Sequence, residues 1–201
     1  MYIVIKGEHV ALRDLVEITP GPSGSLLGKL DSEPDGVPVV SPSDIVGWNH
    51  VNWRKLRRLP EDEAARLERF RLQRDDIVLV RQGSLGRLAL IGPNLERALY
   101  SSSCARVRGR GNRLLPEYLS LYLSSPSMQD EMLKRAGRGT VPSINAKSLG
   151  SLPVVVPPLD RQREVVAAIS DIDELALIHR ETADRLDVLK FALFDDFLDR
   201  R

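Results

Sequence analysis

The spacing of hydrophobic residues changes near residue 159, and this change divides the chain into two regions. Before it, apolar residues stand in short runs separated by Gly, Pro, Ser and Asp, which is typical of short strands and helices joined by turns. Residues 161–199 contain neither Gly nor Pro, and their apolar residues recur every three or four positions. The pattern predicts an α+β fold: a mixed domain over residues 1–158, followed by a long helix within 159–201.

In the first region, a hairpin is the clearest local prediction. Residues 76–81 and 87–92 are two apolar runs on either side of a glycine-containing turn, Gln82–Gly86. The remaining elements are less regular. Further strands are expected over 36–40, with Pro38 at a strand start or sheet edge, and over 51–56 and 98–107, and helices over 60–72, 116–123 and 127–136.

The second region carries a heptad-type seam, in which apolar residues are spaced alternately by four and three. The seam consists of Val165, Ile169, Ile172, Ala176, His179, Ala183, Leu186, Lys190, Leu193 and Phe197. About 39 helical residues form a rod of roughly 58 Å, so we expect the helix to protrude and to pair with a partner helix, forming a homodimer or docking another subunit. The alternative is an amphipathic helix folded back on its own domain.

Charge is balanced overall but unevenly distributed. The 201 residues include 29 Lys and Arg and 28 Asp and Glu, a net charge of +1. Residues 50–115 carry 15 basic and 7 acidic groups, hence +8, whereas residues 154–201 carry 7 and 11, hence −4. The arginines between Arg97 and Arg113 have no acidic neighbour in that window. The basic middle therefore favours a phosphate-bearing partner, and a solvated, salt-bridged surface is the alternative.

Other classes of protein lack support in the sequence. A single cysteine, Cys104, excludes a disulfide framework, and three scattered histidines do not suggest a metal site. No phosphate-binding loop, Gly-x-Ser-x-Gly turn or Asn/Asp-Pro-Pro-Tyr/Phe motif occurs. We therefore expect no catalytic site, cofactor or metal. The apolar runs are too short to cross a bilayer and no signal peptide is visible, so a cytoplasmic location is expected.

Five motifs in order resemble the specificity subunit of type I restriction–modification systems. They are Gly36-Val-Pro-Val-Val-x-x-x-Asp44-Ile45, Asp76-Ile-Val-Leu-Val-Arg-Gln-Gly83-Ser-x-Gly86, Leu115-Pro-Glu-Tyr-Leu-x-x-Tyr-Leu-x-Ser125, Gly139-Thr-Val-Pro-x-Ile-Asn-x-x-x-Leu149 and Leu152-Pro-Val-Val-Val-Pro-Pro-Leu-x-x-Gln162. The resemblance implies a non-catalytic subunit whose globular domain reads half of a bipartite DNA target, and whose helix sets the half-site spacing and docks methyltransferase subunits. This family usually carries two such domains and two helices, whereas the present chain has one of each.

Four groups of residues are candidates for binding double-stranded DNA, because Arg and Gln match base edges and Arg and Lys match phosphates. They are Trp48, Asn49, Arg54 and Lys55; Arg81, Gln82, Ser84 and Arg87; Arg106, Arg108 and Arg110; and Lys134, Arg138 and Thr140. Each group has a structural alternative. The tryptophans could pack in the core, Arg81 or Arg87 could pair with Asp75 or Asp76, and the cations near residue 135 could cap a helix that ends at Gly137. For Gln162, which begins the helix, the favoured role is capping the preceding loop.

Three other functions remain open at this point. The chain could be the DNA-sensing module of another anti-phage modification system. It could also be a helical adaptor that binds protein and does not read DNA, in which case the arginines should mostly be paired with carboxylates. An enzyme with an unrecognised site is the third and weakest hypothesis.

Overall fold

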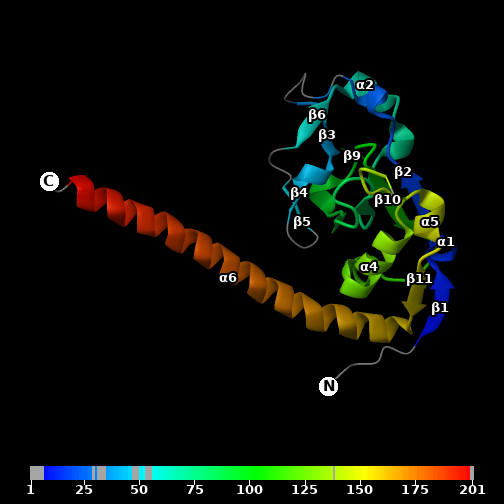
Figure 1. Ribbon diagram of the computed structural model, residues 1–201. Coiled ribbons are helices and arrows are strands. Elements are labelled where there is room, and N and C mark those ends of the chain that lie inside the picture. The colour runs from blue at the N-terminus through cyan, green and yellow to red at the C-terminus, as the bar shows by residue number, and fades with distance from the viewer. Residues whose placement is uncertain are drawn as a thin grey trace. The chain divides into compact units, whose positions relative to one another are not determined.

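A four-stranded antiparallel sheet organises the first part of the chain in the computed structural model, which describes residues 7–28, 30, 35–46, 50–52, 56–137 and 139–199 (Figure 1). Its strands lie in the order β2 (Val16–Pro20), β10 (Cys104–Gly109), β7 (Ile77–Val80) and β8 (Leu88–Leu90). Strands β7 and β8 form the predicted hairpin, with Ile77 opposite Leu90. The central position of β10 places residues 104–109 between two strands that are distant in the sequence.

Smaller sheets complete the strand architecture. A three-stranded sheet has the order β6 (Arg57–Leu59), β3 (Val37–Val40) and β9 (Leu99–Tyr100), and two-stranded sheets join β4 (Ile45–Val46) to β5 (His50–Val51) and β1 (Glu8–Ala11) to β11 (Pro153–Val156). Of the two positions expected for Pro38, the strand start is the one observed: Pro38 is the second residue of β3, which is the middle strand of its sheet. Strand β9 pairs only with Val39 and Val40, so the missing N–H of Pro38 breaks no ladder bond on that side.

The helices follow the prediction after residue 115 more closely than before it. They are α1 (Leu12–Leu15), α2 (Glu61–Ala65), α3 (Pro116–Ser124), α4 (Pro126–Arg135), α5 (Ala146–Gly150) and α6 (Leu159–Asp199). The helix expected over 60–72 ends at Ala65 and is followed by a 3-10 turn over Glu68–Phe70. The single strand expected over 98–107 is two strands, because a turn over residues 101–103 is closed by a hydrogen bond from Cys104 N to Ser101 O of 3.0 Å.

Both faces of the four-stranded sheet are covered, which explains why β7 is apolar at every position. Side chains alternate between the faces of a strand. Ile77 and Leu79 belong to a core shared with α3 and α4, whereas Val78 and Val80 belong to a second core shared with the three-stranded sheet. All four side chains are buried. The continuous apolar run therefore reflects a sheet that lies between two layers.

Two compact units divide the chain, residues 1–162 and 163–201. The predicted border after residue 158 falls one helical turn earlier, because the first turn of α6 is tied to the first unit by Gln162. This side chain is fully buried, and its Nε2 donates to the carbonyl oxygens of Arg113 (2.9 Å) and Pro157 (2.8 Å). Its Oε1 accepts from the N–H of Leu115 at 2.8 Å. The expected structural role of Gln162 is confirmed.

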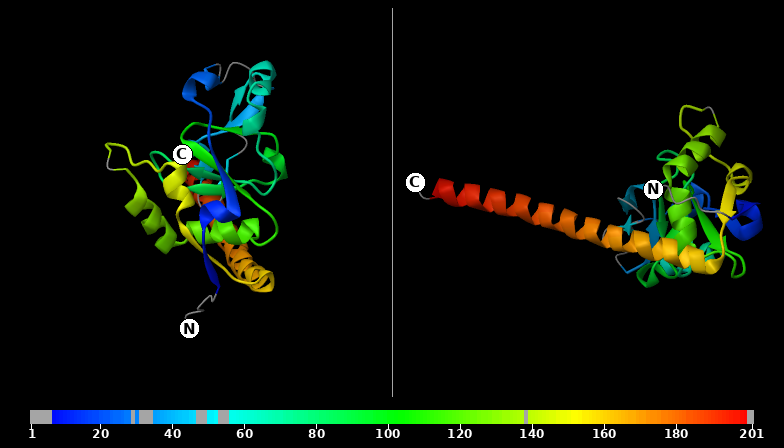
Figure 2. Two further views of the ribbon diagram at one scale, coloured as in Figure 1. Left: turned by 90° about the vertical axis from the view of Figure 1, so that its right-hand side faces the viewer. Right: turned by 90° about the horizontal axis from the view of Figure 1, so that it is seen from below.

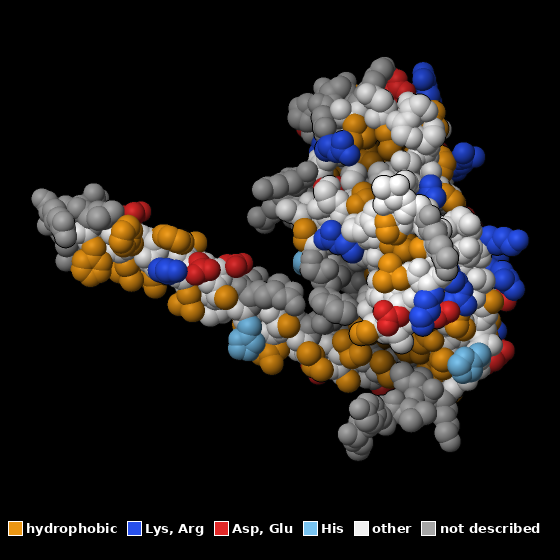
Figure 3. Space-filling view, in the orientation of Figure 1, with side chains coloured by type: hydrophobic (Ala, Val, Ile, Leu, Met, Phe, Trp, Pro, Cys, Tyr) orange, Lys and Arg blue, Asp and Glu red, His pale blue; other side chains and the backbone are white. Residues whose placement is uncertain are grey.

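The second unit consists of α6 from Arg163 onward. Helix α6 is 41 residues long, in agreement with the single uninterrupted helix expected from the sequence. Large apolar side chains along it are exposed in the chain as described, among them Ile172 (65%), Leu186 (60%) and Phe197 (73%). Figure 3 shows hydrophobic side chains along the visible side of α6. None of the described helices is long and apolar enough to cross a membrane.

Candidate nucleic-acid interface

The turn between β7 and β8 presents polar side chains on a backbone that requires glycine. Gly83 and Gly86 adopt left-handed conformations, with φ of 86° and 88°, which favour glycine over residues with a Cβ. The N–H of Gly86 donates to Val80 O at 3.0 Å and closes the turn. Gln82 and Ser84 are exposed. A turn of this kind holds short polar side chains at a surface where another backbone can approach.

The loop after α4 is attached to one side of this turn. The N–H of Gly83 donates to Pro142 O at 3.1 Å, and Ile144 N donates to Arg81 O at 2.9 Å. Ser143 forms isolated bridges with both Gln82 and Gly137. Figure 2 shows the segment between α4 and α5 standing away from the rest of the first unit in both views. The turn and this loop therefore form one connected surface.

Two further elements hold the turn in place. The side chain of Gln129, on α4, donates from Nε2 to Gly86 O at 3.0 Å, and a Cβ at Gly86 would lie only 2.1 Å from Gln129 Oε1. On the other side, Arg87 Nη2 donates to the carbonyl oxygen of Ile45, in the β4–β5 hairpin. We call the combination of residues 81–87, residues 139–144, α4 and the β4–β5 hairpin the turn surface.

The turn surface collects several of the predicted DNA-binding residues. Gln82, Ser84, Arg87, Lys134 and Thr140 are exposed on these elements, and Arg81 is half-buried. The other predicted residues of these groups lie outside the described residues; they are Trp48, Asn49, Arg54, Lys55 and Arg138.

The proposed ion pairs of Arg81 and Arg87 do not occur. Arg81 Nε donates to Ser102 O at 3.1 Å, and Arg87 also donates to a backbone carbonyl. Within the described residues neither side chain has a carboxylate partner. The helix-cap alternative for the Lys134 group is observed in part, because Lys134 and Arg135 lie in the last turn of α4. The glycine cap is not observed, because α4 ends at Arg135 with extended backbone at Ala136, and Gly137 is not left-handed.

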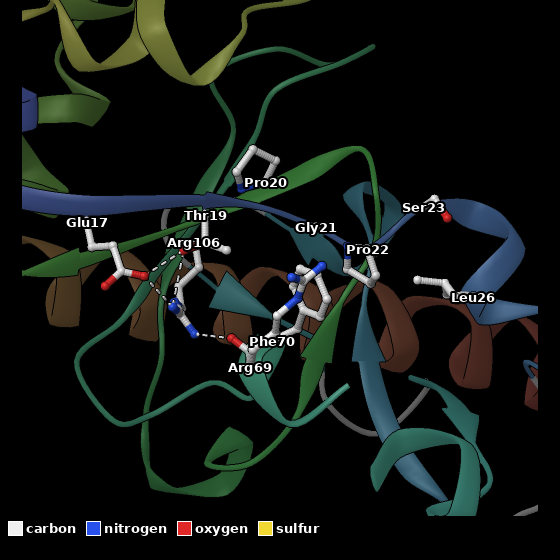
Figure 4. A pocket seen from close by; sticks show the side chains of 10 residues that line it. All are labelled: Glu17, Thr19, Pro20, Gly21, Pro22, Ser23, Leu26, Arg69, Phe70 and Arg106. Carbon is white, nitrogen blue, oxygen red and sulfur yellow. Dashed lines mark hydrogen bonds and ion pairs between the residues drawn. The ribbon is translucent and has the colours of Figure 1, made fainter. Parts of the chain in front are cut away.

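Arg106 lies in the interior instead of on the surface. Only 4% of the residue is exposed. Its Nη1 donates to the carbonyl oxygen of Arg69 (3.0 Å), and its Nη2 donates to Glu17 Oε1 (2.9 Å) and Thr19 Oγ1 (3.2 Å) (Figure 4). Its Nη1 also donates to the carbonyl oxygen of Arg71 (3.2 Å). The prediction that Arg106 meets phosphate is therefore wrong for this fold, because its guanidinium holds the strand β2 and the segment 69–71 together.

Arg108 is likewise committed to a partner within the chain. Its Nε and Nη2 donate to the two carboxylate oxygens of Asp76, each at 2.7 Å, and Asp76 is 1% exposed. These hydrogen bonds raise the pKa of Arg108, so that it stays charged. Unlike Arg106, the Arg108 side chain is 27% exposed, so its predicted phosphate contact stays a prediction, although Asp76 occupies its Nε and Nη2. Arg110, by contrast, is exposed, and its side chain has no partner in the described part of the chain.

The pKa of Glu17 lies below its ordinary value of 4.5, chiefly because the Thr19 hydroxyl donates to its carboxylate, with Arg106 adding to the effect and burial opposing it. A carboxyl group whose pKa is lowered by folding stabilises the fold above its unfolded pKa, and this contribution is lost as the pH falls through the folded pKa. The pair of Glu17 and Arg106 is therefore intact at neutral pH and weakens in acid.

The predicted DNA-binding residues therefore do not form one extended basic surface, because the turn surface and the pair of Arg108 and Asp76 lie at different places. The turn surface lies at the carboxyl end of β7, whereas Asp76, which holds Arg108, precedes the amino end of the same strand. Four residues of β-strand separate these ends by roughly 13 Å. Figure 3 shows Lys and Arg side chains dispersed over the visible face of the first unit, without one continuous patch.

Many arginines are paired with carboxylates that the sequence does not place nearby. Arg113 pairs with Glu8 at 2.5 Å, and Arg71 pairs with Glu61 at 2.7 Å. This is the pairing that the protein-binding alternative predicts. On the turn surface, Arg135 and Lys134 of α4 also pair with a carboxylate, that of Glu131, whereas Arg81 and Arg87 have no carboxylate partner among the described residues. No group of three or more possible metal ligands occurs among the residues that the structure describes.

The sequence placed candidate residues on α4 and in the loop that follows it, but it did not indicate that both elements contact the β7–β8 turn. Gln129 donates a hydrogen bond to Gly86, 43 residues earlier in the chain, and no local sequence pattern predicts such a contact. The glycine motif around Gly139 and Pro142 was a usable signal, because loops with Gly and Pro reach the surface and carry function. It did not indicate that this loop lies beside the β7–β8 turn.

The chain belongs to a family whose model matches residues 6–187, described as the type I restriction modification DNA specificity domain. Curated relatives are similar to it over most of its length. It is 25% identical over 146 residues to the type I restriction enzyme EcoBI specificity subunit of Escherichia coli, covering 71% of this chain and 30% of that protein. It is 29% identical over 154 residues to the EcoKI specificity subunit of Escherichia coli K12, covering 71% and 32%.

Solved structures show the same fold. The HsdS subunit from Thermoanaerobacter tengcongensis matches with a TM-score of 0.60 at 18% identity, covering 87% of this chain and 39% of that one. The type I restriction-modification S subunit from M. genitalium matches with a TM-score of 0.58 at 16% identity, covering 87% and 41%. The chain spans between 25% and 39% of the length of the two curated relatives above and of two further ones that it matches.

Proposed function

We propose that this chain is a non-catalytic DNA-recognition subunit of a type I restriction–modification system in the cytoplasm, which reads one half-site and positions methyltransferase subunits on DNA. The observation that carries the proposal is the family match over residues 6–187. The turn surface supports it, because exposed Gln, Ser, Arg and Lys side chains gather there on anchored backbone. Base readout requires donors and acceptors held by a rigid scaffold.

The long helix is the proposed site of subunit contact. Seam residues such as Ile172, Leu186 and Leu193 are more than half exposed. Apolar residues repeated over several heptads are stabilised by a partner helix. We propose that two copies pair through the seam, so that two domains read a palindromic bipartite target. The acidic character of this region, −4 over residues 154–201, favours a protein partner there over DNA.

The proposal is tested by titrating salt into a mixture of the full chain and duplex DNA. Each phosphate contact releases counterions, so log K should fall linearly with log salt concentration, with a slope of about −0.9 for each phosphate neutralised. Lys134→Ala should reduce this slope by about one. Arg74→Ala removes an exposed charge at the other end of β7 and should leave the slope unchanged. Salt-independent binding, or no binding at low salt, would refute DNA recognition.

The protein-binding adaptor stays a second candidate because many arginines have carboxylate partners. It predicts no binding to duplex DNA at any salt concentration. A DNA-sensing module of another modification system predicts DNA binding without association with a methyltransferase subunit. The same titration, followed by co-purification with a type I methyltransferase subunit, separates the three possibilities.

A further inference from the structure

Exposed apolar side chains on the first unit are concentrated around the turn surface. Among its described residues the large hydrophobic side chains with substantial exposure are Leu26 (50%), Val46 (41%), Leu133 (54%) and Val141 (49%). Single exposed apolar residues are ordinary on protein surfaces. Three of these four, however, lie within one helical turn or one residue of a residue that hydrogen-bonds to the segment 83–87, and that coincidence calls for a common partner.

The covalent neighbours establish this placement. Val141 precedes Pro142, whose carbonyl oxygen accepts from Gly83 N at 3.1 Å. Val46 follows Ile45, whose carbonyl oxygen accepts from Arg87. Leu133 lies four residues, or about one helical turn, after Gln129, which donates to Gly86 O.

Polar groups without internal partners stand at the centre of this apolar rim. The side chains of Gln82 and Ser84 are exposed, and within the described residues neither forms a side-chain hydrogen bond. Arg87 and Lys134 add positive charge at the rim. A surface that combines a free amide, free hydroxyl, apolar side chains and cations fits a polyanion that also presents methyl groups.

The major-groove edge of an A·T base pair has this combination of groups. Adenine offers the N7 acceptor and the N6 donor that a Gln amide matches bidentately, and thymine offers its C5-methyl group to apolar side chains. Gln82 and Val141 belong to segments joined by the bridge between Gln82 and Ser143, so one A·T step can lie against both.

We infer that the turn surface reads an A·T pair, with Gln82 on adenine and the exposed Val141 on the thymine methyl group. The inference rests on the proposed function, since it assigns the base that the DNA-reading surface prefers. Val46 and Leu133 complete the apolar rim around that contact. The inference therefore names Val141, which the sequence did not single out, as a specificity-determining residue.

The test uses two pools of random duplex DNA, one containing thymine and one containing uracil, which lacks the methyl group. Duplexes enriched from the thymine pool are resynthesised with uracil at each A·T position. For the unaltered full chain, one uracil should weaken binding about fourfold, the factor expected for one buried methyl group. In Val141→Ala that difference should disappear, while Leu26→Ala, an exposed apolar residue elsewhere, should retain it.

The possible failures are distinguishable. Equal binding of thymine and uracil duplexes by the unaltered chain would overturn the inference and leave the proposed function intact. A uracil effect that persists in Val141→Ala would overturn the assignment to Val141. If neither pool yields an enriched sequence, the proposed function fails, and the inference fails with it. Gln82→Ala should lose the preference for adenine but keep the response to uracil.

Discussion

A chain carrying both Ile172→Glu and Leu186→Glu is expected to be monomeric under conditions where the unaltered chain is dimeric. Both residues are exposed seam positions of α6. In a symmetric dimer each substitution places two carboxylates in the interface, and burying an unpaired charge costs several kcal/mol. The dissociation constant should rise at least a thousandfold, or about 4 kcal/mol.

The matched control keeps the charge and moves it to the other side of the helix. Ala167 and Ser170 are exposed, and at 100° per residue they point away from the seam. Ala167→Glu together with Ser170→Glu should therefore remain dimeric. Analytical ultracentrifugation measures both variants, and circular dichroism shows whether α6 stays helical. An unaltered chain that is monomeric at high concentration, or a control that dissociates equally, would contradict pairing through the seam.

Arg106→Leu should lower the free energy of unfolding by about 2–4 kcal/mol. The substitution leaves two carbonyl oxygens, those of Arg69 and Arg71, without their donor in the interior. Loss of the ion pair with Glu17 contributes less to the decrease in unfolding free energy than the two carbonyl oxygens do, because the Glu17 side chain is 49% exposed and can be hydrated. Urea denaturation measures the change.

Arg110→Leu is the control for this prediction. It removes the same charge from the same segment, but the Arg110 side chain is exposed and has no partner among the described residues. Its unfolding free energy should stay within about 0.5 kcal/mol of the unaltered chain. Equal effects of the two substitutions would mean that Arg106 has no structural role. The pair of variants thus separates an arginine that holds the fold from one that is free to meet a partner.

The elements that the sequence predicts best are those with a strong local pattern. The β7–β8 hairpin has two apolar runs and glycines in the turn, and α6 has an uninterrupted heptad pattern. The prediction of one strand over 98–107 was wrong in part, because the three serines at residues 101–103 form a turn. The apolar residues on both sides of these serines did not indicate a turn. The helix expected over 60–72 ended early although its apolar residues Leu67 and Phe70 do reach the core.

The acidic residues close to an arginine in the sequence did not predict which carboxylate it pairs with. The segment from Arg97 to Arg113 contains no acidic residue. The carboxylate partners of Arg106 and Arg108 come from other parts of the sequence, because β10 lies between β2 and β7. Glu17 is on β2, and Asp76 immediately precedes β7. A sheet brings such residues together only once its strand order is known.

The turn surface contains both a part that the local sequence predicts and a part that it does not. Its central residues, Gln82 and Ser84, were predictable because polar residues in a glycine-containing hairpin turn are placed at the surface. Its surroundings were not, because they come from three other segments of the chain. The apolar residue Val141 gained its significance only when the loop that carries it was found beside that turn.

Selection from random duplexes shows directly whether this chain distinguishes DNA sequences. The full chain is incubated with the pool at physiological salt, where non-specific phosphate contacts are weakened, and the bound duplexes are sequenced. We expect enrichment of one half-site, repeated as an inverted pair at constant spacing when the chain dimerises. A bound fraction with the same sequence composition as the starting pool would contradict it.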